Sequence, residues 1–477
     1  MTKQGNQVHT HLMGIGGIGM SALAQALAAR GERLSGCDLH PSPITAKLER
    51  LGIAVRQGHD PEHLAGVDRV VASDAIRPDD PELGRARELG LPVLRRSELV
   101  GELMRGRRGI AVAGTHGKTT TTAMIGLILA QAGRDPTVLL GGELPQFGGN
   151  ARVGGGELMV VEACEAYESF LDLEPEIAVI TNIEPEHLDH HHTEQALVDS
   201  FARFLAQVRA GGSVIVCADD ANASSVVART GVVAAGVNVV SYGVEQGADY
   251  RAVDVRDEGM GMGFTLTHPG GRAPVRLAIP GVHNVADAAA AMAACAAAGV
   301  DAEESAPALA SFTGVERRFQ VSATAAGVTV VDDYAHHPTE IRAVIAAARP
   351  RCRGKLVIVF QPHLYSRTRD FLAGFAESLS LGDMVIVTDI YAAREEPLPG
   401  IDGEAVARAM RERGEKQAHF EPHKDEVAAR LVDRLAAGDW VLVLGAGDIG
   451  SVAEDLVKSL NCRAACRREQ GGSVCQP

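Results

Sequence analysis

Residues 114–120 read Gly-Thr-His-Gly-Lys-Thr-Thr, a glycine-rich loop with one lysine. The loop follows the apolar run 110–113 and precedes a helical pattern that reaches about residue 132. Glycines let backbone N–H groups approach phosphate oxygens, the helix N-terminus adds partial positive charge, and the lysine reaches the terminal phosphates. We therefore predict that this loop binds a nucleotide, with Lys118 as a catalytic residue. The predicted contacts are Gly114, Thr115, His116, Gly117, Lys118, Thr119 and Thr120.

Three side chains could hold Mg2+ beside this loop. Thr119 offers a hydroxyl, Glu162 ends the apolar run 158–161, and His187 follows the run 177–181. Parallel strands place their carboxyl ends at one edge of a sheet, so these groups should lie near the phosphates. A carboxylate suits Mg2+, and a histidine suits Mn2+ better, so Mn2+ could substitute. We predict metal ligation by Thr119, Glu162 and His187, with Glu162 and His187 also in the catalytic set.

A second glycine pattern, Gly14-x-Gly16-x-x-Gly19, follows the apolar run 8–13 and precedes a helical pattern. Asp38, nineteen residues after Gly19, completes a dinucleotide fingerprint. Because any diphosphate suits a helix N-terminus, two hypotheses stay open: an NAD-linked oxidoreductase, or a protein that binds a UDP-sugar. If the ligand is a UDP-sugar, as the family resemblance described below implies, its contacts are Gly14, Gly16, Gly17, Gly19, Asp38 and Ser73.

The same glycine spacing occurs once more, at residues 445–450, after the apolar run 440–444. Only 27 residues follow it, too few for a second strand with an acidic partner. We interpret this pattern as a turn that faces the active cleft.

Polar groups also gather after two apolar runs of the last third of the chain. Residues 332–340 include His336 and His337, and residues 361–370 include Arg367 and Arg369. Arginine forks suit carboxylates, and histidines donate hydrogen bonds or transfer protons. These segments therefore predict an anion site.

Short β-branched runs alternate with alanine-rich helical stretches along the chain, which is typical of parallel α/β sheets. We predict an α/β protein of three domains, at residues 1–106, 107–312 and 313–460. The segment 249–278 alternates and contains Gly and Pro, so it should form antiparallel strands inserted in the central domain. Residues 461–477 lack periodicity and are predicted to be a disordered tail.

Composition narrows the function further. The chain has 477 residues and a net charge of -15, which argues against a nucleic-acid partner. Its longest apolar stretch, residues 288–300, is too short to span a membrane, and its N-terminus lacks an apolar signal region. Eight cysteines over this length fit a reducing cytoplasm. None of the lysines lies between Lys118 and Lys355.

From residue 8 to about 457 the chain resembles the Mur ligase family. Residues 11–20 resemble the family's UDP-binding loop and residues 114–121 its ATP loop. The other similar segments are 181–187 for the metal, 280–284 for the adenine, 312–319 for the hinge into the third domain, and 332–340, the most diagnostic block.

This resemblance implies a Rossmann-like UDP-binding domain, a P-loop-type ATPase domain and a Rossmann-like domain for the amino acid. It implies ATP-dependent joining of L-alanine to the lactyl carboxylate of UDP-N-acetylmuramate, through an acyl phosphate and a tetrahedral intermediate, in peptidoglycan precursor synthesis. A related ligase with another acceptor is the alternative. The implied enzyme is a cytoplasmic monomer or dimer whose partners are these two small molecules.

The resemblance also assigns further residues. It adds His283, Asn284 and Arg317 to the ATP contacts, and it makes His336, Arg367 and Arg369 the amino-acid contacts. His336, His337 or the substrate phosphate would accept the proton of the amine. Several relatives bridge metal ions with a carbamylated lysine, which a central domain without lysine after Lys118 cannot do.

Overall fold

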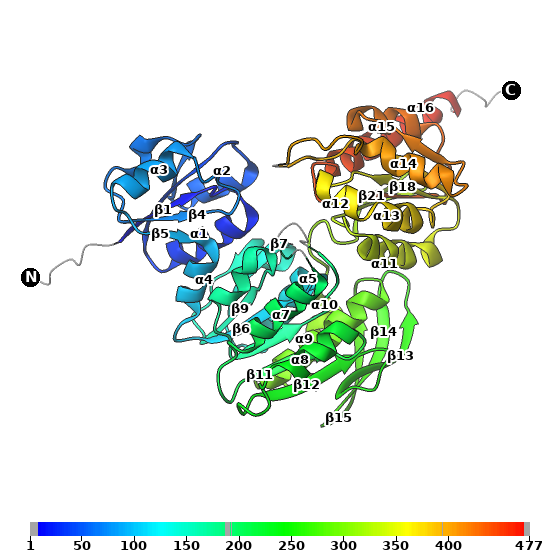
Figure 1. Cartoon of the computed structure of the whole chain (residues 1–477). Coiled ribbons are helices and arrows are strands. Elements are labelled where there is room, and N and C mark those ends of the chain that lie inside the picture. The colour runs from blue at the N-terminus through cyan, green and yellow to red at the C-terminus, as the bar shows by residue number, and fades with distance from the viewer. Residues whose placement is uncertain (1–7, 187–190, 192, 394, 472–477) are drawn as a thin grey trace, which may run out of the picture. The chain divides into compact units, whose positions relative to one another are not determined.

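The computed structural model describes residues 8–186, 191, 193–393 and 395–471. The chain forms two compact units, coloured along the sequence in Figure 1. The first unit contains the described residues up to 258, together with 262–278 and 284–315. The second contains residues 259–261, 279–283 and those from 316 onward.

The first unit begins with a five-stranded parallel sheet in the order β3-β2-β1-β4-β5. Its elements are β1 (His9–Met13), α1 (Ile18–Ala29), β2 (Arg33–Asp38), α2 (Pro43–Arg50), β3 (Ala54–Gln57), η1 (Pro61–Leu64), β4 (Arg69–Ala72), α3 (Pro81–Glu88), β5 (Val93–Arg95) and α4 (Arg96–Met104). Apolar side chains of α1, α2 and α4 pack in one core, and those of η1 and α3 in another. Strand order reverses at β1, where open α/β sheets bind ligands.

A ten-stranded sheet forms the rest of the first unit, in the order β15-β14-β13-β12-β11-β10-β6-β9-β7-β8. Its elements are β6 (Arg108–Ala113), α5 (Lys118–Gln131), β7 (Thr137–Leu144), η2 (Pro145–Phe147), β8 (Gly149–Arg152), β9 (Leu158–Glu162), η3 (Ala166–Asp172), β10 (Ile177–Ile180), α7 (Glu194–Leu205), β11 (Ser213–Cys217), α8 (Ala221–Arg229), β12 (Asn238–Gly243), β13 (Tyr250–Asp257), β14 (Met262–His268), β15 (Gly271–Leu277), α9 (Val282–Ala297) and α10 (Ala302–Ser311). The antiparallel pairs β13–β14 and β14–β15 confirm the predicted insert, which extends the same sheet.

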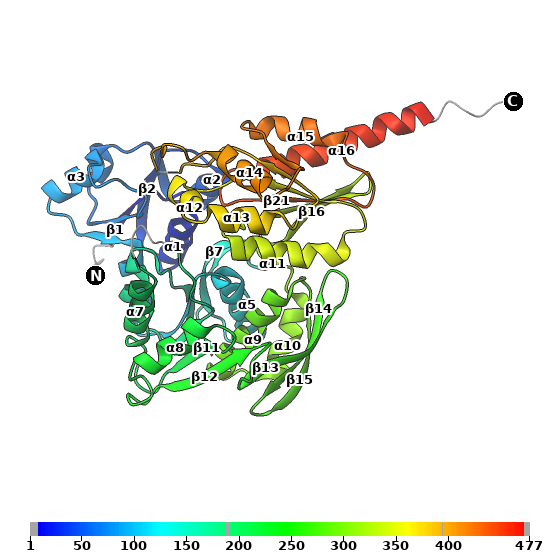
Figure 2. The same ribbon diagram turned by 45° about the vertical axis from the view of Figure 1, so that its right-hand side comes forward.

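The second unit is a six-stranded sheet in the order β16-β17-β21-β18-β19-β20. Its elements are β16 (Gln320–Ala325), β17 (Val328–Asp333), α11 (Pro338–Ala348), η4 (Arg349–Arg351), β18 (Leu356–Phe360), α12 (Tyr365–Asp370), α13 (Leu372–Leu379), β19 (Met384–Val387), α14 (Gly403–Glu412), β20 (Ala418–Phe420), α15 (Lys424–Val432), β21 (Trp440–Leu444) and α16 (Gly450–Gly471). Helices α11, α13 and α14 cover one face and α15 and α16 the other, as Figure 2 shows. Both units together give the predicted α/β fold with three sheets.

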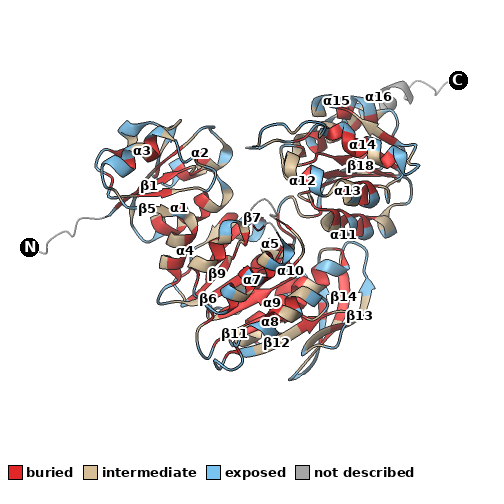
Figure 3. Cartoon of the chain, in the orientation of Figure 1, coloured by how far each residue is buried: buried red, intermediate tan, exposed pale blue. Residues whose placement is uncertain are grey.

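The central strands are apolar because helices cover both of their faces. Every residue of β18 and β21 is buried, and so is nearly all of β6 (Figure 3). This arrangement explains why the sequence shows these strands as continuous apolar runs rather than alternating patterns. None of the helices in the described part of the chain is long and apolar enough to cross a membrane.

The prediction of a disordered tail at residues 461–477 is wrong for residues 461–471. Helix α16 continues without a break from Gly450 to Gly471, past residue 461 where we placed the start of the tail. The segment after residue 461 is rich in alanine and arginine, which extend a helix that packing has already nucleated. Residues 472–477 lie outside the described part of the chain.

Candidate active site

The predicted ATP loop joins strand β6 to helix α5. Gly114 has φ +135° and Gly117, the residue that caps α5, has φ +81°. A Cβ atom on Gly114 would lie 1.9 Å from Thr181 Oγ1, and one on Gly117 would lie 2.5 Å from Asp287 Oδ1. Only glycine satisfies both the backbone conformation and the available space at these two positions. Thr119 and Thr120 follow in the buried first turn of α5.

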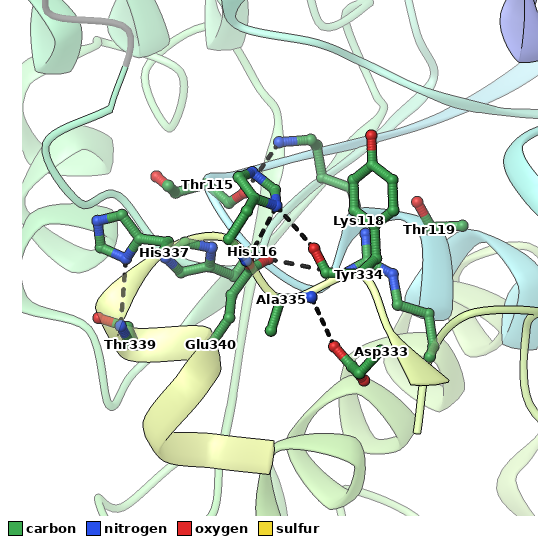
Figure 4. Close-up of polar contacts among 12 residues, drawn as sticks. Thr115, His116, Lys118, Thr119, Asp333, Tyr334, Ala335, His337, Thr339 and Glu340 are labelled. Carbon is green, nitrogen blue, oxygen red and sulfur yellow. Dashed lines mark hydrogen bonds and ion pairs between the residues drawn. The ribbon is translucent and has the colours of Figure 1, made fainter. Parts of the chain in front are cut away.

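Lys118 lies inside this loop and bonds to it. Its Nζ donates to the carbonyl of Thr115 at 3.0 Å (Figure 4) and to the carbonyl of Gly114, and it pairs with the buried Glu165 at 3.0 Å. Burial acts to lower the pKa of Lys118, but the charges of Glu165, Cys164 and Glu162 and the hydrogen bond to Glu165 together outweigh burial, so the pKa is raised. The lysine is therefore a permanent cation at the N-terminus of α5.

Two of the three predicted metal ligands lie together. Thr119 Oγ1 donates to Glu162 Oε2 at 3.0 Å, and Glu162 also accepts from the N–H of Gly141. The register that pairs Val112 with Glu162 places the carboxylate at the strand end beside the loop. The third predicted ligand, His187, lies outside the described residues.

The segment after β10 holds the ATP loop in shape. Asn182 Oδ1 accepts from the N–H of His116 at 2.9 Å, and its Nδ2 donates to the carbonyl of His116 at 3.1 Å. Thr181 Oγ1 donates to the same carbonyl at 2.6 Å. Glu184 N donates to Thr115 Oγ1 at 2.9 Å. The segment therefore positions the loop backbone in addition to any role in metal binding.

The predicted UDP-sugar residues also lie together. Gly16 N donates to Asp38 Oδ2 at 2.9 Å, so this carboxylate braces the loop itself. Gly14 has φ +75°, and a Cβ on it would lie 3.1 Å from Ser73 Cβ at the end of β4. Gly17 caps α1. Gly19 lies next to Arg96, whose side chain would be 3.2 Å from an added Cβ.

Gly17 and Gly19 of the first glycine loop and Lys118 of the ATP loop line one cavity of about 300 Å³. The N-terminal domain contributes Gly17, Gly19, Ser73 and Arg96, and the central domain contributes Lys118, Gly141, Glu162 and Cys164. A ligand whose diphosphate lies at the first loop could therefore extend to a phosphate at the second.

Asn150 ties the walls of this cavity together. Its Nδ2 donates to the carbonyl of Ile18 and, at 2.8 Å, to Ser21 Oγ. Gln25 Nε2 donates to Asn150 Oδ1 at 2.9 Å. The side chain of one residue of β8 thus holds the first turns of α1 by three hydrogen bonds.

In the second unit, residues after β17 form a buried polar cluster. Asp333 accepts from the N–H groups of Ala335 at 2.7 Å and Phe319 at 2.6 Å (Figure 4). Burial raises the pKa of Asp333 to about 6. His336 N donates to Glu340 Oε2 at 3.0 Å, and the ring of His336 contacts the carbonyl of Tyr334 at 2.9 Å.

The second predicted histidine, His337, is buried and caps helix α11. Its Nδ1 accepts from Thr339 N at 3.3 Å, and its ring packs edge to face on Phe371 at 4.7 Å. These bonds hold the imidazole at one end of the sheet, on the same loop as His336.

The two predicted arginines of α12 do not lie together. Arg367 is buried and its Nη1 is 3.0 Å from His363 Nδ1. Arg369 is 55% exposed in its side chain and pairs with Asp370 at 2.7 Å. Residues two apart in a helix face different sides, so Arg367 is the better placed of the two for a carboxylate.

The additional ATP residues are placed as follows. Arg317 donates to the carbonyls of Gly445 at 2.7 Å and Gly447 at 3.1 Å, and it pairs with Asp332. His283 is exposed at the start of α9. Asn284 is buried in the first turn of α9, in the first unit.

Sequence analysis missed Glu165 and Arg96. Glu165 follows Glu162 by three residues, and a second carboxylate just past a strand end is a usable signal for a partner of the loop lysine. Arg96 gave no such signal, because it lies in a helix more than 70 residues from the loop it contacts.

Comparison with known proteins agrees with this arrangement of three domains. Residues 9–108 match the Mur ligase family catalytic domain, 112–295 the Mur ligase middle domain, and 317–447 the Mur ligase glutamate ligase domain. The chain belongs to the Mur ligase family.

Relatives of known name point to one branch of that family. The chain is 45% identical to the UDP-N-acetylmuramate–L-alanine ligase of Anaeromyxobacter sp. (strain Fw109-5), over 94% of this chain and 96% of the relative. It is 42% identical to the enzyme of the same name from Sorangium cellulosum (strain So ce56), over 97% and 98%.

A solved structure agrees with these relatives. The UDP-N-acetylmuramate-alanine ligase MurC of Thermotoga maritima aligns with a TM-score of 0.80 at 29% identity, covering 95% of this chain and 99% of that one. These matches give no support to the NAD-linked oxidoreductase that the Gly14 pattern left open.

Proposed function

We propose that the protein is an ATP-dependent ligase that joins L-alanine to the lactyl carboxylate of UDP-N-acetylmuramate and releases ADP and phosphate. The observation that supports this most directly is the cavity lined both by Gly17 and Gly19 of the first glycine loop and by Lys118 and Glu162 of the central domain. With the UDP at the Gly14 loop and ATP at the Gly114 loop, the lactyl carboxylate would approach the γ-phosphate. The carboxylate attacks this phosphate, ADP leaves, and an acyl phosphate forms.

The attack brings a carboxylate onto a polyanion, so the site must supply positive charge. Lys118 and the N-terminus of α5 do so, and the ion pair with Glu165 keeps Lys118 protonated. Arg96, on the opposite wall of the cavity, is a second cation near the sugar-binding loop. These groups stabilise charge that develops during phosphoryl transfer.

The oxygen donors beside the loop fit Mg2+. A threonine hydroxyl and a carboxylate 3.0 Å apart are hard ligands of the kind that this ion prefers. We propose that Thr119 and Glu162 hold Mg2+, with His187 as the third protein ligand. When bound, Mg2+ would neutralise phosphate charge.

The second unit would bind the amino acid. Arg367 is the proposed contact for the alanine carboxylate, because its guanidinium is buried beside His363. The amine of L-alanine must lose a proton before it attacks the carbonyl carbon of the acyl phosphate. This attack forms a tetrahedral intermediate. His336, His337 and the substrate phosphate remain the candidate acceptors, and the neutral amine then displaces phosphate to form the amide.

The test is ADP release by the purified protein with ATP, Mg2+ and UDP-N-acetylmuramate, with each amino acid added in turn. We expect L-alanine to stimulate release most, and the product to gain the mass of one alanyl residue. D-Alanine is the matched control, because it presents the same groups in the opposite hand.

Failure of L-alanine, glycine and L-serine to stimulate ADP release would contradict this proposal. Stimulation only by an amino acid or peptide added to UDP-N-acetylmuramoyl-L-alanine would identify a related ligase with another acceptor.

A further inference from the structure

Four side chains from four elements converge in the N-terminal domain, on the face of the sheet that α3 covers. Each offers one nitrogen, sulfur or oxygen atom, and these atoms all lie within 4.8 Å of one another. The ligation reaction proposed above uses none of them. The four residues are His11 in β1, Cys37 in β2, His63 in η1 and Glu82 in α3.

Glu82 lies at the centre of this cluster. Its Oε1 is 2.8 Å from His11 Nε2, and its Oε2 is 3.4 Å from His63 Nδ1 and 3.3 Å from Cys37 Sγ. A tetrahedral zinc ion with bonds of about 2.0–2.3 Å holds its ligand atoms roughly 3.3–3.8 Å apart. The cluster is therefore already close to the size of a zinc site.

Outer hydrogen bonds direct His11 toward the cluster. The carbonyl of Gly66 can only accept, so His9 donates to it from Nδ1 at 2.8 Å and, when neutral, accepts through Nε2 from Ser35 Oγ at 2.8 Å. Ser35 Oγ must then accept from His11 Nδ1, at 2.9 Å. This chain leaves Nε2 as the ligating nitrogen of His11, in the way that outer partners of metal-bound histidines fix the tautomer.

Charge balance also fits a divalent cation. The side chains of His11 and Glu82 are fully buried, so the pair shares one proton when no ion is bound. The buried Cys37 thiol holds a second proton, which it donates to Glu82 Oε2 at 3.3 Å. A divalent cation would replace both protons, and its two charges would balance one carboxylate and one thiolate. The buried cluster carries no net charge in either state.

We propose that His11, Cys37, His63 and Glu82 bind one Zn2+ ion in a closed structural site. Two imidazoles, a thiolate and a carboxylate are ligands that Zn2+ accepts and that Mg2+ does not prefer. The ion would enter the site beside His63, whose side chain is 15% exposed.

The ion would also act on the sugar-binding loop. The carbonyl of Cys37 accepts from the N–H groups of Gly14 at 2.9 Å and Ile15 at 3.0 Å. A ligand bond at the Cys37 sulfur therefore restrains the strand end to which the Gly14 loop is bonded.

The experiment is a Co2+ titration of the metal-free, full-length protein, in excess Mg2+ so that the phosphate loop is not the site observed. All variants have the substitutions Cys462→Ser, Cys466→Ser and Cys475→Ser, which remove the sulfur ligands of the tail. We expect one equivalent of Co2+, a thiolate-to-cobalt absorption band, and displacement of Co2+ by Zn2+. Cys37→Ser should abolish the band.

His63→Asn is the second variant, because its partly exposed side chain is the least needed for folding. It should weaken Co2+ binding by at least about 10-fold and remove the rise in melting temperature that Zn2+ gives the parent protein. Cys164→Ser and Cys352→Ser are the matched controls and should keep the band. A band that survives Cys37→Ser, no band in the folded parent, or unchanged Co2+ affinity in His63→Asn would overturn the proposal.

Discussion

The glycine loops at residues 114–117 and 445–450, one in each unit, are each closed by a cation. In the first loop, Lys118 donates to the carbonyls of Gly114 and Thr115 and pairs with Glu165. The loop caps a helix of 14 residues. Lys118 also lines a cavity together with Gly17 and Gly19 of the sugar-binding loop.

The second loop is closed in the same manner. Arg317 donates to the carbonyls of Gly445 and Gly447 and pairs with Asp332. A Cβ on Gly447 would lie 2.5 Å from Gln361 Oε1, and one on Gly117 would likewise lie 2.5 Å from Asp287 Oδ1. In both loops the glycines therefore make room for neighbouring side chains of the same unit.

The difference teaches that glycine spacing alone does not define a nucleotide site. Both loops follow a buried parallel strand and precede a helix, and both bond to a cation. What separates them is the surroundings of each loop. Lys118, directly after the first loop, lines a cavity of about 300 Å³, whereas Gly447 of the second loop packs on Gln361 and Tyr391.

Removing the cation of the first loop should have the largest effect. Lys118→Ala should lower kcat for ADP release by about 10³-fold or more, because the charge that stabilises phosphoryl transfer is lost. The measurement is steady-state turnover with UDP-N-acetylmuramate and L-alanine. Lys355→Ala, at an exposed lysine of the second unit, is the control and should leave kcat unchanged. Near-normal turnover by Lys118→Ala would place phosphate binding elsewhere.

The glycines of the two loops should respond differently to alanine. Gly117→Ala forces a side chain onto Asp287 at a position with φ +81°, so the KM for ATP should rise by roughly 100-fold. Gly447→Ala should leave the KM for ATP within about 2-fold and lower the melting temperature of the second unit instead. A large rise in KM for ATP in Gly447→Ala would show that both loops meet the nucleotide.

Removing the cation of the second loop should mainly reduce stability. Arg317→Ala loses its bonds to two carbonyls and leaves Asp332 without this partner, which should cost about 2 kcal/mol of unfolding free energy. Trp440, the single tryptophan of the chain, lies in β21 of the same sheet and reports this unfolding by its fluorescence. A variant with normal stability and a raised KM for ATP would instead favour the nucleotide contact predicted for Arg317.

The smallest expected effect concerns pH and the second unit. Burial raises the pKa of Asp333 from 3.8 to about 6, so the folded state binds its proton more tightly than the unfolded state. Stability should therefore increase as the pH falls through 6 toward 3.8, by about 1 kcal/mol between pH 7 and pH 5 from this group. Trp440 fluorescence in urea measures it. Asp333→Asn should flatten this gain, and an equal pH dependence in the variant would assign the effect to other groups.

The order of strands and loops could be predicted from sequence because buried parallel strands are continuous apolar runs. Runs such as 158–162 and 440–444 coincide with β9 and β21, and the polar residues after them lie at sheet edges. Glu162 and Thr119 were predicted to lie together and do so. The proximity of two such residues can be predicted from the order of the parallel strands alone.

Groups brought together by packing between distant elements could not be predicted. The contact of Arg96 with the Gly19 loop depends on how α4 packs beside α1. The cluster around Glu82 joins four elements whose residues have no common spacing. The two arginines of α12 were treated as equivalent, because their opposite faces become visible only once the helix starts at Tyr365.

The three hydrogen bonds of Asn150 have a consequence for the timing of catalysis. These bonds hold α1, the helix after the sugar-binding loop, against β8. Strand β8 is the edge strand of the sheet that contains the ATP loop. The separation of these two loops is therefore established when the first unit folds, and not anew in each turnover. In the proposed reaction, the phosphoryl group could pass from ATP to the lactyl carboxylate before the amino acid arrives, so that the activated sugar waits for its acceptor.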